Sequence, residues 1–201
     1  MPARLHLRLL LRLAVAAPAL PARVTWFHAR ALCVAISRHD HFTLRSMAAP
    51  HQLVVLVRLA RGRRRVVELG TATGWTAAAL ALADPRRTVI TCDPNVQPGR
   101  DRYLRLLSPA TCARIALLRT TGLAAATLDA QPVDVLFVDA SHERQATVDE
   151  WRAWRPRLAP GGIVIFHDYD HPDFPGVAQA VAELGLTGEQ RAGMFVWRAP
   201  R

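Results

Sequence analysis

From residue 61 onward, short runs of β-branched and other apolar residues alternate with longer stretches rich in Ala and Leu. Apolar runs of five or six residues are typical of buried parallel strands, and the longer stretches are typical of crossover helices. We expect a helix over residues 75–83, because Pro85 disfavours helical geometry at Asp84. Residues 158–162 read as a tight turn. The strands that the pattern predicts are residues 65–69, 88–92, 115–119, 133–138, 163–167 and 194–198.

Strands that alternate with helices predict a Rossmann-like α/β fold, doubly wound around a mostly parallel sheet. The first 60 residues differ, because they read as helical, with interruptions at Pro18, Pro21 and Pro50. A chain of 201 residues is long enough for one substantial core and short for two. We therefore expect one structural domain, in which residues 1–60 form an N-terminal helical cap and residues 61–201 form the α/β unit.

Positive charge is concentrated at the N-terminus. The net charge is +10, and residues 1–65 hold 12 Arg against the single acid Asp40. Such a surface can attract nucleic acid or a membrane, but the absence of Lys favours a bias in composition. Arg4, Arg8 and Arg12 share one face of a predicted helix. Peripheral contact of this helix with a membrane stays open, although we favour a packed helix, and a nucleic-acid partner stays open without being favoured.

The chain has few signs of an extracellular or membrane setting. Its three cysteines, Cys33, Cys92 and Cys112, follow no metal-finger or disulfide spacing. The charge-free stretch of residues 13–22 is too short to span a bilayer and contains two prolines. We therefore expect a reduced, cytoplasmic setting.

The most informative motif follows the first predicted strand, where Glu68 is followed by Gly70, Thr71, Ala72, Thr73 and Gly74. The two glycines allow a ligand to approach the backbone, and the helix that begins next presents free N–H groups. A dinucleotide site would have Gly-x-Gly-x-x-Gly, whereas Ala72 stands at the middle position here. Asp93 ends the next strand, where a carboxylate can accept hydrogen bonds from both ribose hydroxyls. The acid within the first strand favours S-adenosylmethionine over a dinucleotide.

Two further strands end in polar residues. Asp139 and His142 follow the strand of residues 133–138, and His167 and Asp168 follow the next. The tips of neighbouring strands lie about 5 Å apart, so Asp139 and Asp168 are expected to share one ion. His142 is placed to take a proton from an acceptor hydroxyl near that ion.

These motifs resemble the class I S-adenosylmethionine-dependent methyltransferases of the catechol-type and macrolide-sugar O-methyltransferase branch. The likeness runs from about residue 66 to 197 and is densest at residues 139–142, 160–162, 167–168 and 175–177. It implies a seven-stranded sheet. It also implies that Asp139, His167 and Asp168 hold a divalent metal, Mg²⁺ or Mn²⁺, and that His142 is a general base. The loop of residues 68–74, Asp93 and Gly122 would hold the cofactor.

The chain departs from that family at two positions. His167 stands where an acid is frequent, and a His/Asp/Asp set suits Mn²⁺, Fe²⁺ or Zn²⁺ at least as well as Mg²⁺. Gly122 lacks the polar side chain that is often found near the adenine.

The function that we expect is O-methylation of a small-molecule hydroxyl, with catalytic roles for His142 and Asp139 and assistance from a divalent metal. Two alternatives remain. The first is a metal-independent methyltransferase that acts on RNA or protein, with the arginine-rich segment holding a polyanion. The second is a non-catalytic S-adenosylmethionine-binding module. The acceptor is not readable from the sequence, and a homo-oligomer remains open.

Overall fold

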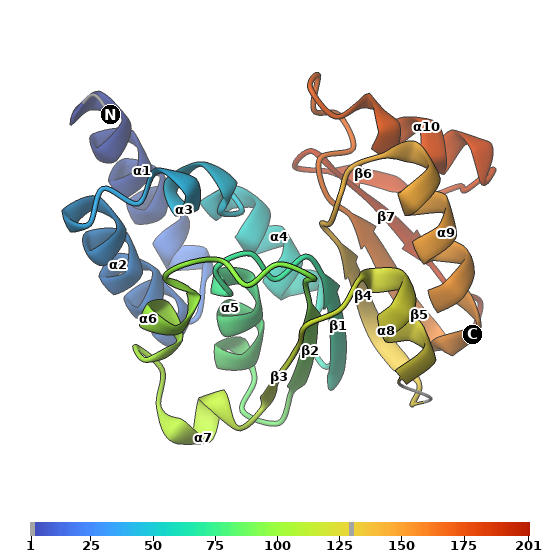
Figure 1. The fold of residues 1–201 in the computed structure, drawn as a ribbon, viewed down its shortest axis with the longest axis horizontal. Coiled ribbons are helices and arrows are strands. Elements are labelled where there is room, and N and C mark those ends of the chain that lie inside the picture. The colour runs from blue at the N-terminus through green and yellow to red at the C-terminus, as the bar shows by residue number, and fades with distance from the viewer. Residues whose placement is uncertain (1–2, 129–130) are drawn as a thin grey trace.

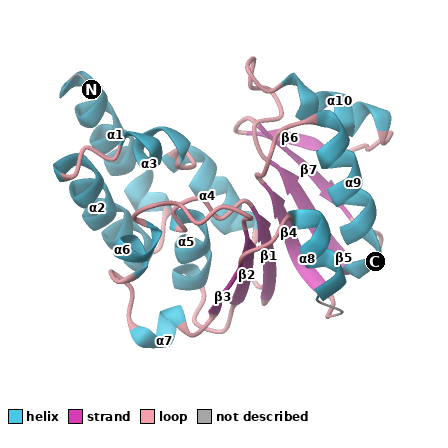
Figure 2. Ribbon diagram, viewed as in Figure 1, coloured by secondary structure: helices cyan, strands magenta, loops and turns pink. Residues whose placement is uncertain are grey.

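The computed structural model describes residues 3–128 and 131–201, in which a seven-stranded sheet lies between two helical layers (Figure 1; Figure 2). The strand order is β3-β2-β1-β4-β5-β7-β6, and β1 to β5 run parallel while β7 is antiparallel to β5 and β6. The predicted mostly parallel, doubly wound fold is confirmed. The strands are β1 Arg65–Leu69, β2 Thr88–Cys92, β3 Ile115–Leu118, β4 Val133–Val138, β5 Leu158–Phe166, β6 Glu189–Arg191 and β7 Met194–Arg198.

Four predicted strands and the helix α5 (Trp75–Ala83) match the structure at both ends, and β3 is one residue shorter than predicted. The predicted turn over residues 158–162 is wrong, because β5 already begins at Leu158, which pairs with Val133. Gly161, with a φ of 66°, and a register shift between Val133 and Val135 bend the paired strands at this point. The strand β6 was not predicted, because it is a three-residue polar edge strand.

Successive residues of the central strands serve opposite faces of the sheet. Val66 and Val135 face the helices α4 (Pro50–Leu59) and α5, whereas Val67 and Leu136 face the other side. The second layer consists of α8 (Gly122–Leu128), α9 (Arg144–Trp154) and α10 (Pro175–Glu183), which lie together beside β4 and β5 in Figure 1. This two-sided burial explains why the strands read as nearly continuous apolar runs.

The predicted helical segment at the N-terminus folds into α1 (Ala3–Ala16), a short 3₁₀ turn (Ala17–Ala19), α2 (Ala22–Ser37), α3 (His41–Ser46) and α4. Pro21 lies at the N-cap of α2 and Pro50 is the first residue of α4, where proline fits a helix start. Leu56 of α4 packs directly on the sheet. The helices α1, α2 and α3 pack behind α4, around Trp75 of α5. The division of the chain at residue 60 remains a prediction.

The surface of α1 is partly apolar, since Leu7, Leu11 and Val15 are exposed. Within the described ranges, no helix combines the length and the apolar character that crossing a membrane requires. Two short helices, α6 (Arg100–Leu104) and α7 (Pro109–Cys112), connect β2 with β3.

Candidate active site

A cleft of about 1510 Å³ opens at the carboxyl ends of the central strands. It lies where the chain reverses its strand order between β1 and β4, which is where open α/β sheets bind ligands. Residues from α1, α3 and α4 form the wall opposite the strand tips, among them Leu9, Phe42 and Pro50. The volume exceeds that of a typical pocket for one small ligand, so a cofactor and an acceptor fit together.

The loop after β1 is held against β4 by a close backbone contact. Gly70 has a φ of 102°, and a Cβ atom there would lie 1.9 Å from the carbonyl oxygen of Asp139. Glycine is therefore required at position 70 by both conformation and space.

Asp93 fixes the next turn of the same loop. Its Oδ2 accepts a hydrogen bond from the Ala72 N–H at 3.0 Å, and its Oδ1 accepts one from the Asn95 N–H at 2.8 Å.

The predicted cofactor residues occupy two positions relative to the cleft. Gly70, Ala72, Asp93 and Gly122 line it. Behind that wall, Glu68, Thr71 and Thr73 are buried, and Gly74 caps the start of α5.

Glu68 belongs to a buried hydrogen-bond network. Its Oε2 accepts a 2.5 Å hydrogen bond from the Thr91 hydroxyl, which also contacts the Thr71 hydroxyl at 2.7 Å. Burial raises the pKa of Glu68 to about 8, against the effect of the Thr91 hydrogen bond and with a contribution from the charge of Asp139. The buried Glu68 side chain is therefore linked, through Thr91, to Thr71 in the loop after β1.

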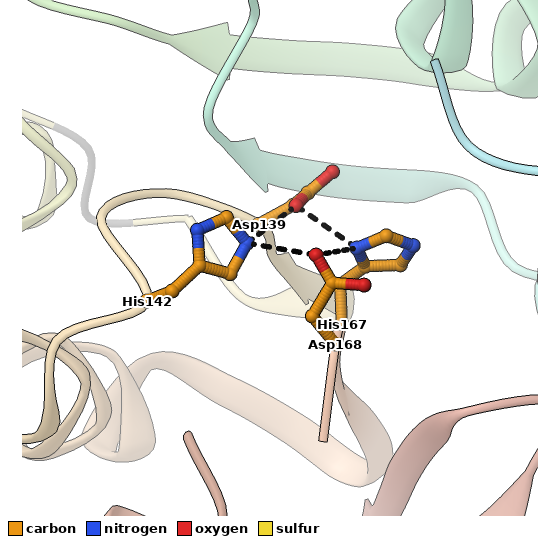
Figure 3. A group of neighbouring side chains, drawn as sticks. All are labelled: Asp139, His142, His167 and Asp168. Atoms are coloured by element: carbon orange, nitrogen blue, oxygen red, sulfur yellow. Dashed lines mark hydrogen bonds and ion pairs between the residues drawn. The ribbon is translucent and has the colours of Figure 1, made fainter. Parts of the chain in front are cut away.

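Four side chains converge at the tips of β4 and β5 (Figure 3). His142 Nε2 lies 3.2 Å from Asp139 Oδ1 and 3.3 Å from Asp168 Oδ2. His167 Nδ1 lies 3.1 Å and 3.2 Å from the same two oxygens. The donor atoms of all four residues lie within 4.8 Å of one another. The structure thus brings together the three residues predicted to bind a metal and the predicted base.

His167 is oriented by a residue of α4. Its Nε2 lies 3.2 Å from Gln52 Oε1, which can only accept, so this nitrogen carries the proton and donates. Its Nδ1 is buried and makes no hydrogen bond of suitable geometry with any residue that the structure describes, although two carboxylates face it. A neutral Nδ1 lone pair would face the lone pairs of these oxygens, so a proton or a cation is needed between them. The donor set therefore fits a divalent cation.

The carboxylates and the imidazoles of the cluster stabilise each other's charged forms. Burial opposes the charged imidazoles, but Asp139 and Asp168 outweigh it and raise the pKa of His142 to about 9 and that of His167 to about 10. Burial would likewise raise the pKa of Asp139 and Asp168, yet the two histidines hold the pKa of both carboxyls below its usual range. In the metal-free protein both histidines therefore carry protons at neutral pH.

Three cleft residues have strained backbone. Ala72, His142 and Asp168 have positive φ values of 44°, 61° and 51°, a conformation that is uncommon for residues other than glycine. Two further such residues, His39 and Ala192, do not line the cleft. Strained residues of this kind persist where the surrounding structure holds them, and they cluster at functional sites. Figure 3 shows the side chains of His142 and Asp168 directed toward the centre of the cluster.

Among the cleft residues that were not predicted from the sequence, Gln52, Glu150 and Phe174 bear most directly on the site. The ring of Phe174 stacks on His142, with centroids 4.4 Å apart. Gln52 contacts a residue 115 positions away in the chain. A local signal that could have pointed to Phe174 is its place between Pro172 and Pro175, in the segment directly after Asp168.

Comparison with known proteins places the chain in a family. A family model described as a methyltransferase domain matches residues 67–169, just over half of the chain. Among curated proteins, ribosomal RNA large subunit methyltransferase G of Pseudomonas putida is 34% identical over 99 residues, which cover 47% of this chain and 25% of that protein. The chain thus spans about a quarter of the length of this relative.

Solved structures share the fold. The O-methyltransferase TomG from Streptomyces achromogenes, involved in tomaymycin synthesis and solved with S-adenosylmethionine, has a TM-score of 0.63 and 22% identity, with coverage of 80% of this chain and 86% of TomG. CalS11, a TDP-rhamnose 3'-O-methyltransferase of calicheamicin biosynthesis, has a TM-score of 0.59 and 19% identity over 73% of this chain and 78% of CalS11. The chain therefore belongs to the methyltransferase domain family and has the class I methyltransferase fold.

Proposed function

We propose that the protein transfers a methyl group from S-adenosylmethionine to a hydroxyl group of a small molecule, with help from a divalent cation. The observation that carries the proposal is the convergence of Asp139, His142, His167 and Asp168 in the same cleft as Gly70 and Asp93. A loop suited to the methyl donor and a cluster suited to the acceptor oxygen thus share one cavity.

The cofactor would lie along the tips of β1 and β2. Each Asp93 oxygen already accepts one backbone hydrogen bond and retains a lone pair for a ribose hydroxyl. Gly70, Ala72 and Gly122 expose backbone on the cleft wall, while Glu68, Thr71, Thr73 and Gly74 maintain the loop from behind. S-adenosylmethionine, when bound, supplies an electrophilic methyl group on its sulfonium.

Asp139, His167 and Asp168 would hold the cation, which supplies Lewis acidity toward the acceptor oxygen. One imidazole with two carboxylates suits Mn²⁺ better than Mg²⁺, which prefers oxygen ligands. His142 is assigned the role of base. The same carboxylates hold the proton on His142 in the free protein, and their neutralisation by a cation would release that proton. The stacking of the His142 ring on Phe174 keeps the His142 Nε2 directed at the cluster.

A small acceptor fits the enclosure of the cleft. Side chains of α3, of α4 and of the segment between them, namely Phe42, Pro50 and Met47, face the strand tips across it, with His171 and Phe174 on the loop after β5. TomG and CalS11 both serve natural-product pathways by their descriptions, which supports the same class of acceptor here. The match to the ribosomal RNA methyltransferase covers a quarter of that protein and does not favour an RNA substrate.

The test is calorimetric titration of the purified protein with S-adenosylhomocysteine and, separately, with Mn²⁺. We expect micromolar binding of the first, and Mn²⁺ binding that Asp139→Asn weakens on the order of 100-fold. His142→Ala should leave both affinities within about threefold while lowering kcat on the order of 100-fold. Absence of S-adenosylhomocysteine binding by a folded sample would overturn the proposal, and a parallel loss of Mn²⁺ affinity in His142→Ala would make His142 a ligand instead of a base.

A further inference from the structure

A buried carboxyl group without a partner lies on the wall of the cleft, away from the four-residue cluster. Glu150 of α9 is 7% exposed, and its side chain lines the cavity. Over the described ranges, 3–128 and 131–201, its carboxylate takes part in no hydrogen bond or salt bridge, and only the charge of His142 acts on it from a distance. Acidic side chains are almost never buried in this way unless they are paired, so Glu150 is positioned for a ligand.

The structure builds this position from two elements. Trp154, one helical turn after Glu150 and on the same face of α9, is fully buried, and its Nε1 donates a 2.8 Å hydrogen bond to the Gly122 carbonyl oxygen. This bond fixes α9 against the start of α8. A Cβ atom on Gly122 would lie 2.3 Å from Glu150 Oε1. Gly122 therefore leaves the space that the Glu150 carboxyl occupies.

The place of Glu150 in the cleft identifies the part of the ligand that it faces. In the proposed function, the methyl end of the cofactor must face the cluster around Asp139, and the ribose faces Asp93. The purine would then lie against the cleft residues around Glu150, which include Gly122, Leu123 and Ala146. Of the two carboxyl groups on this stretch of α9, Asp149 accepts a hydrogen bond from Gln145 Nε2 at 2.9 Å, which leaves Glu150 as the one without such a bond to any described residue. An amino group on the purine is the natural partner of this carboxyl group.

We infer that Glu150 binds the amino edge of the adenine and makes the protein prefer cofactors whose purine carries the 6-amino group over those with hydrogen at that position. The inference rests on the proposed function of the cleft. Adenine presents the N6 amino group as a donor and N1 as an acceptor on adjacent atoms. A carboxyl group that carries its proton matches both, because one oxygen accepts from N6 and the other donates to N1. Glu150 thus supplies from α9 the polar group that is absent at Gly122.

The environment of Glu150 supports this pairing. Burial raises the pKa of Glu150 to about 7, against a smaller effect from His142. Near neutral pH a large fraction of the carboxyl group therefore retains the proton that N1 would accept. A buried group of this kind discriminates strongly, because a ligand that leaves it unpaired loses the hydrogen bonds and still excludes water.

The experiment compares two ligands on the same protein samples. S-adenosylhomocysteine carries the amino group, whereas the analogue with unsubstituted purine in place of adenine carries a hydrogen atom at that position and leaves one Glu150 oxygen without a donor. Their dissociation constants are measured by calorimetry for the wild-type protein, Glu150→Gln, Glu150→Leu and the control Asp149→Asn. Because each preference is a ratio from one preparation, a partly unfolded sample does not alter it.

We expect the wild-type protein to prefer S-adenosylhomocysteine by about 30-fold or more. Glu150→Gln, whose amide matches N6 and N1 in the same way, should keep a preference within about threefold of that value. Glu150→Leu should weaken S-adenosylhomocysteine binding about tenfold or more and abolish the preference. Asp149→Asn should behave as the wild type.

An unchanged preference in Glu150→Leu would overturn the inference while leaving the proposed function intact. If neither ligand binds the folded wild-type protein, the proposed function itself fails, so the two failures are distinguishable.

Discussion

The N-terminal helices and the sheet differ in how chemistry and charge are distributed. The segment of residues 3–60 carries most of the excess positive charge, whereas the acids and histidines of the cluster and the cofactor loop all lie at strand ends. The helical segment contributes mainly apolar contacts, around Trp75 and on the sheet face. The sheet thus carries the four-residue cluster and the loop after β1, while α1, α3 and α4 form the opposite wall of the cleft. In the proposed function, the sheet would align the reactants and these helices would shape the acceptor space.

One residue crosses this division. Gln52 of α4 contacts His167 and also accepts a 2.9 Å hydrogen bond from the Ala49 N–H through the same Oε1. The helical segment therefore reaches the donor atoms of the cluster through an outer contact of a kind that commonly tunes metal sites.

The largest effect is expected from replacing Gly70, which follows β1. Gly62, which precedes β1, provides the comparison. Gly70→Ala should destabilise the protein by about 4 kcal/mol, because the methyl group meets the Asp139 carbonyl and the φ of 102° is unfavourable for alanine. The control Gly62→Ala, at the junction with α4, also has a positive φ but meets no atom within 4 Å. It should cost about 1 kcal/mol. Urea unfolding measures both, and equal losses would contradict the argument from the close contact.

A second test concerns acid sensitivity inside the helical segment. His28 is 3% exposed, its Nδ1 lies 3.0 Å from the Val24 carbonyl oxygen, and burial lowers its pKa to about 4 despite that hydrogen bond. Between pH 6.5 and pH 4 the unfolded state therefore binds more protons than the folded state. The free energy of unfolding decreases as the pH is lowered through this window.

We expect His28 to contribute a loss of about 2 kcal/mol between pH 7 and pH 5. In urea unfolding at the two pH values, His28→Gln should show a smaller difference than the wild type by that amount. His51→Gln, at an exposed position of α4, serves as the control. A pH dependence that is the same in all three proteins would show that His28 is not responsible.

A third test breaks the link between the two regions. Gln52→Ala removes the acceptor for His167 Nε2, so we expect Mn²⁺ affinity to fall about tenfold, with S-adenosylhomocysteine binding retained. Gln145→Ala is the matched control, because Gln145 lines the same cleft but pairs with Asp149. Calorimetric titration with Mn²⁺ measures both, and equal affinities for the two variants would remove Gln52 from the metal site.

The smallest effect is expected from the basic surface. Arg23, Arg30 and Arg38 are exposed on or next to α2, and their joint replacement by Gln should change the unfolding free energy by less than about 1 kcal/mol. Methylation of a small acceptor should be unaffected. Retention of the wild-type protein on immobilised RNA at varied salt provides the contrast. Strong retention that the triple variant loses would instead support the RNA alternative.

The sequence predicted those parts of the structure that depend on local pattern. The central strands are buried on both faces and are therefore readable as apolar runs, and Asp139 and Asp168 were placed at strand tips by those boundaries. The edge strand β6 is polar, and residues 158–162 extend β5 because of their pairing partners, so neither was readable locally. Gln52 reaches the cluster only because α4 packs near His167, 115 positions later in the chain, and Glu150 is placed by the packing of α9 against the start of α8.

The contact between Gly70 and the Asp139 carbonyl has a consequence for how the enzyme could change its acceptor. The donor loop and the acceptor cluster are joined through main-chain atoms, and the hydrogen bond from the Asp139 N–H to the Leu69 carbonyl continues the same ladder. Under the proposed function, substitutions in the helices that cover the cleft, other than at Gln52, would therefore reshape the acceptor space without disturbing the main-chain contact between the donor loop and the cluster. The fold would thus let acceptor selectivity change while reactivity is maintained.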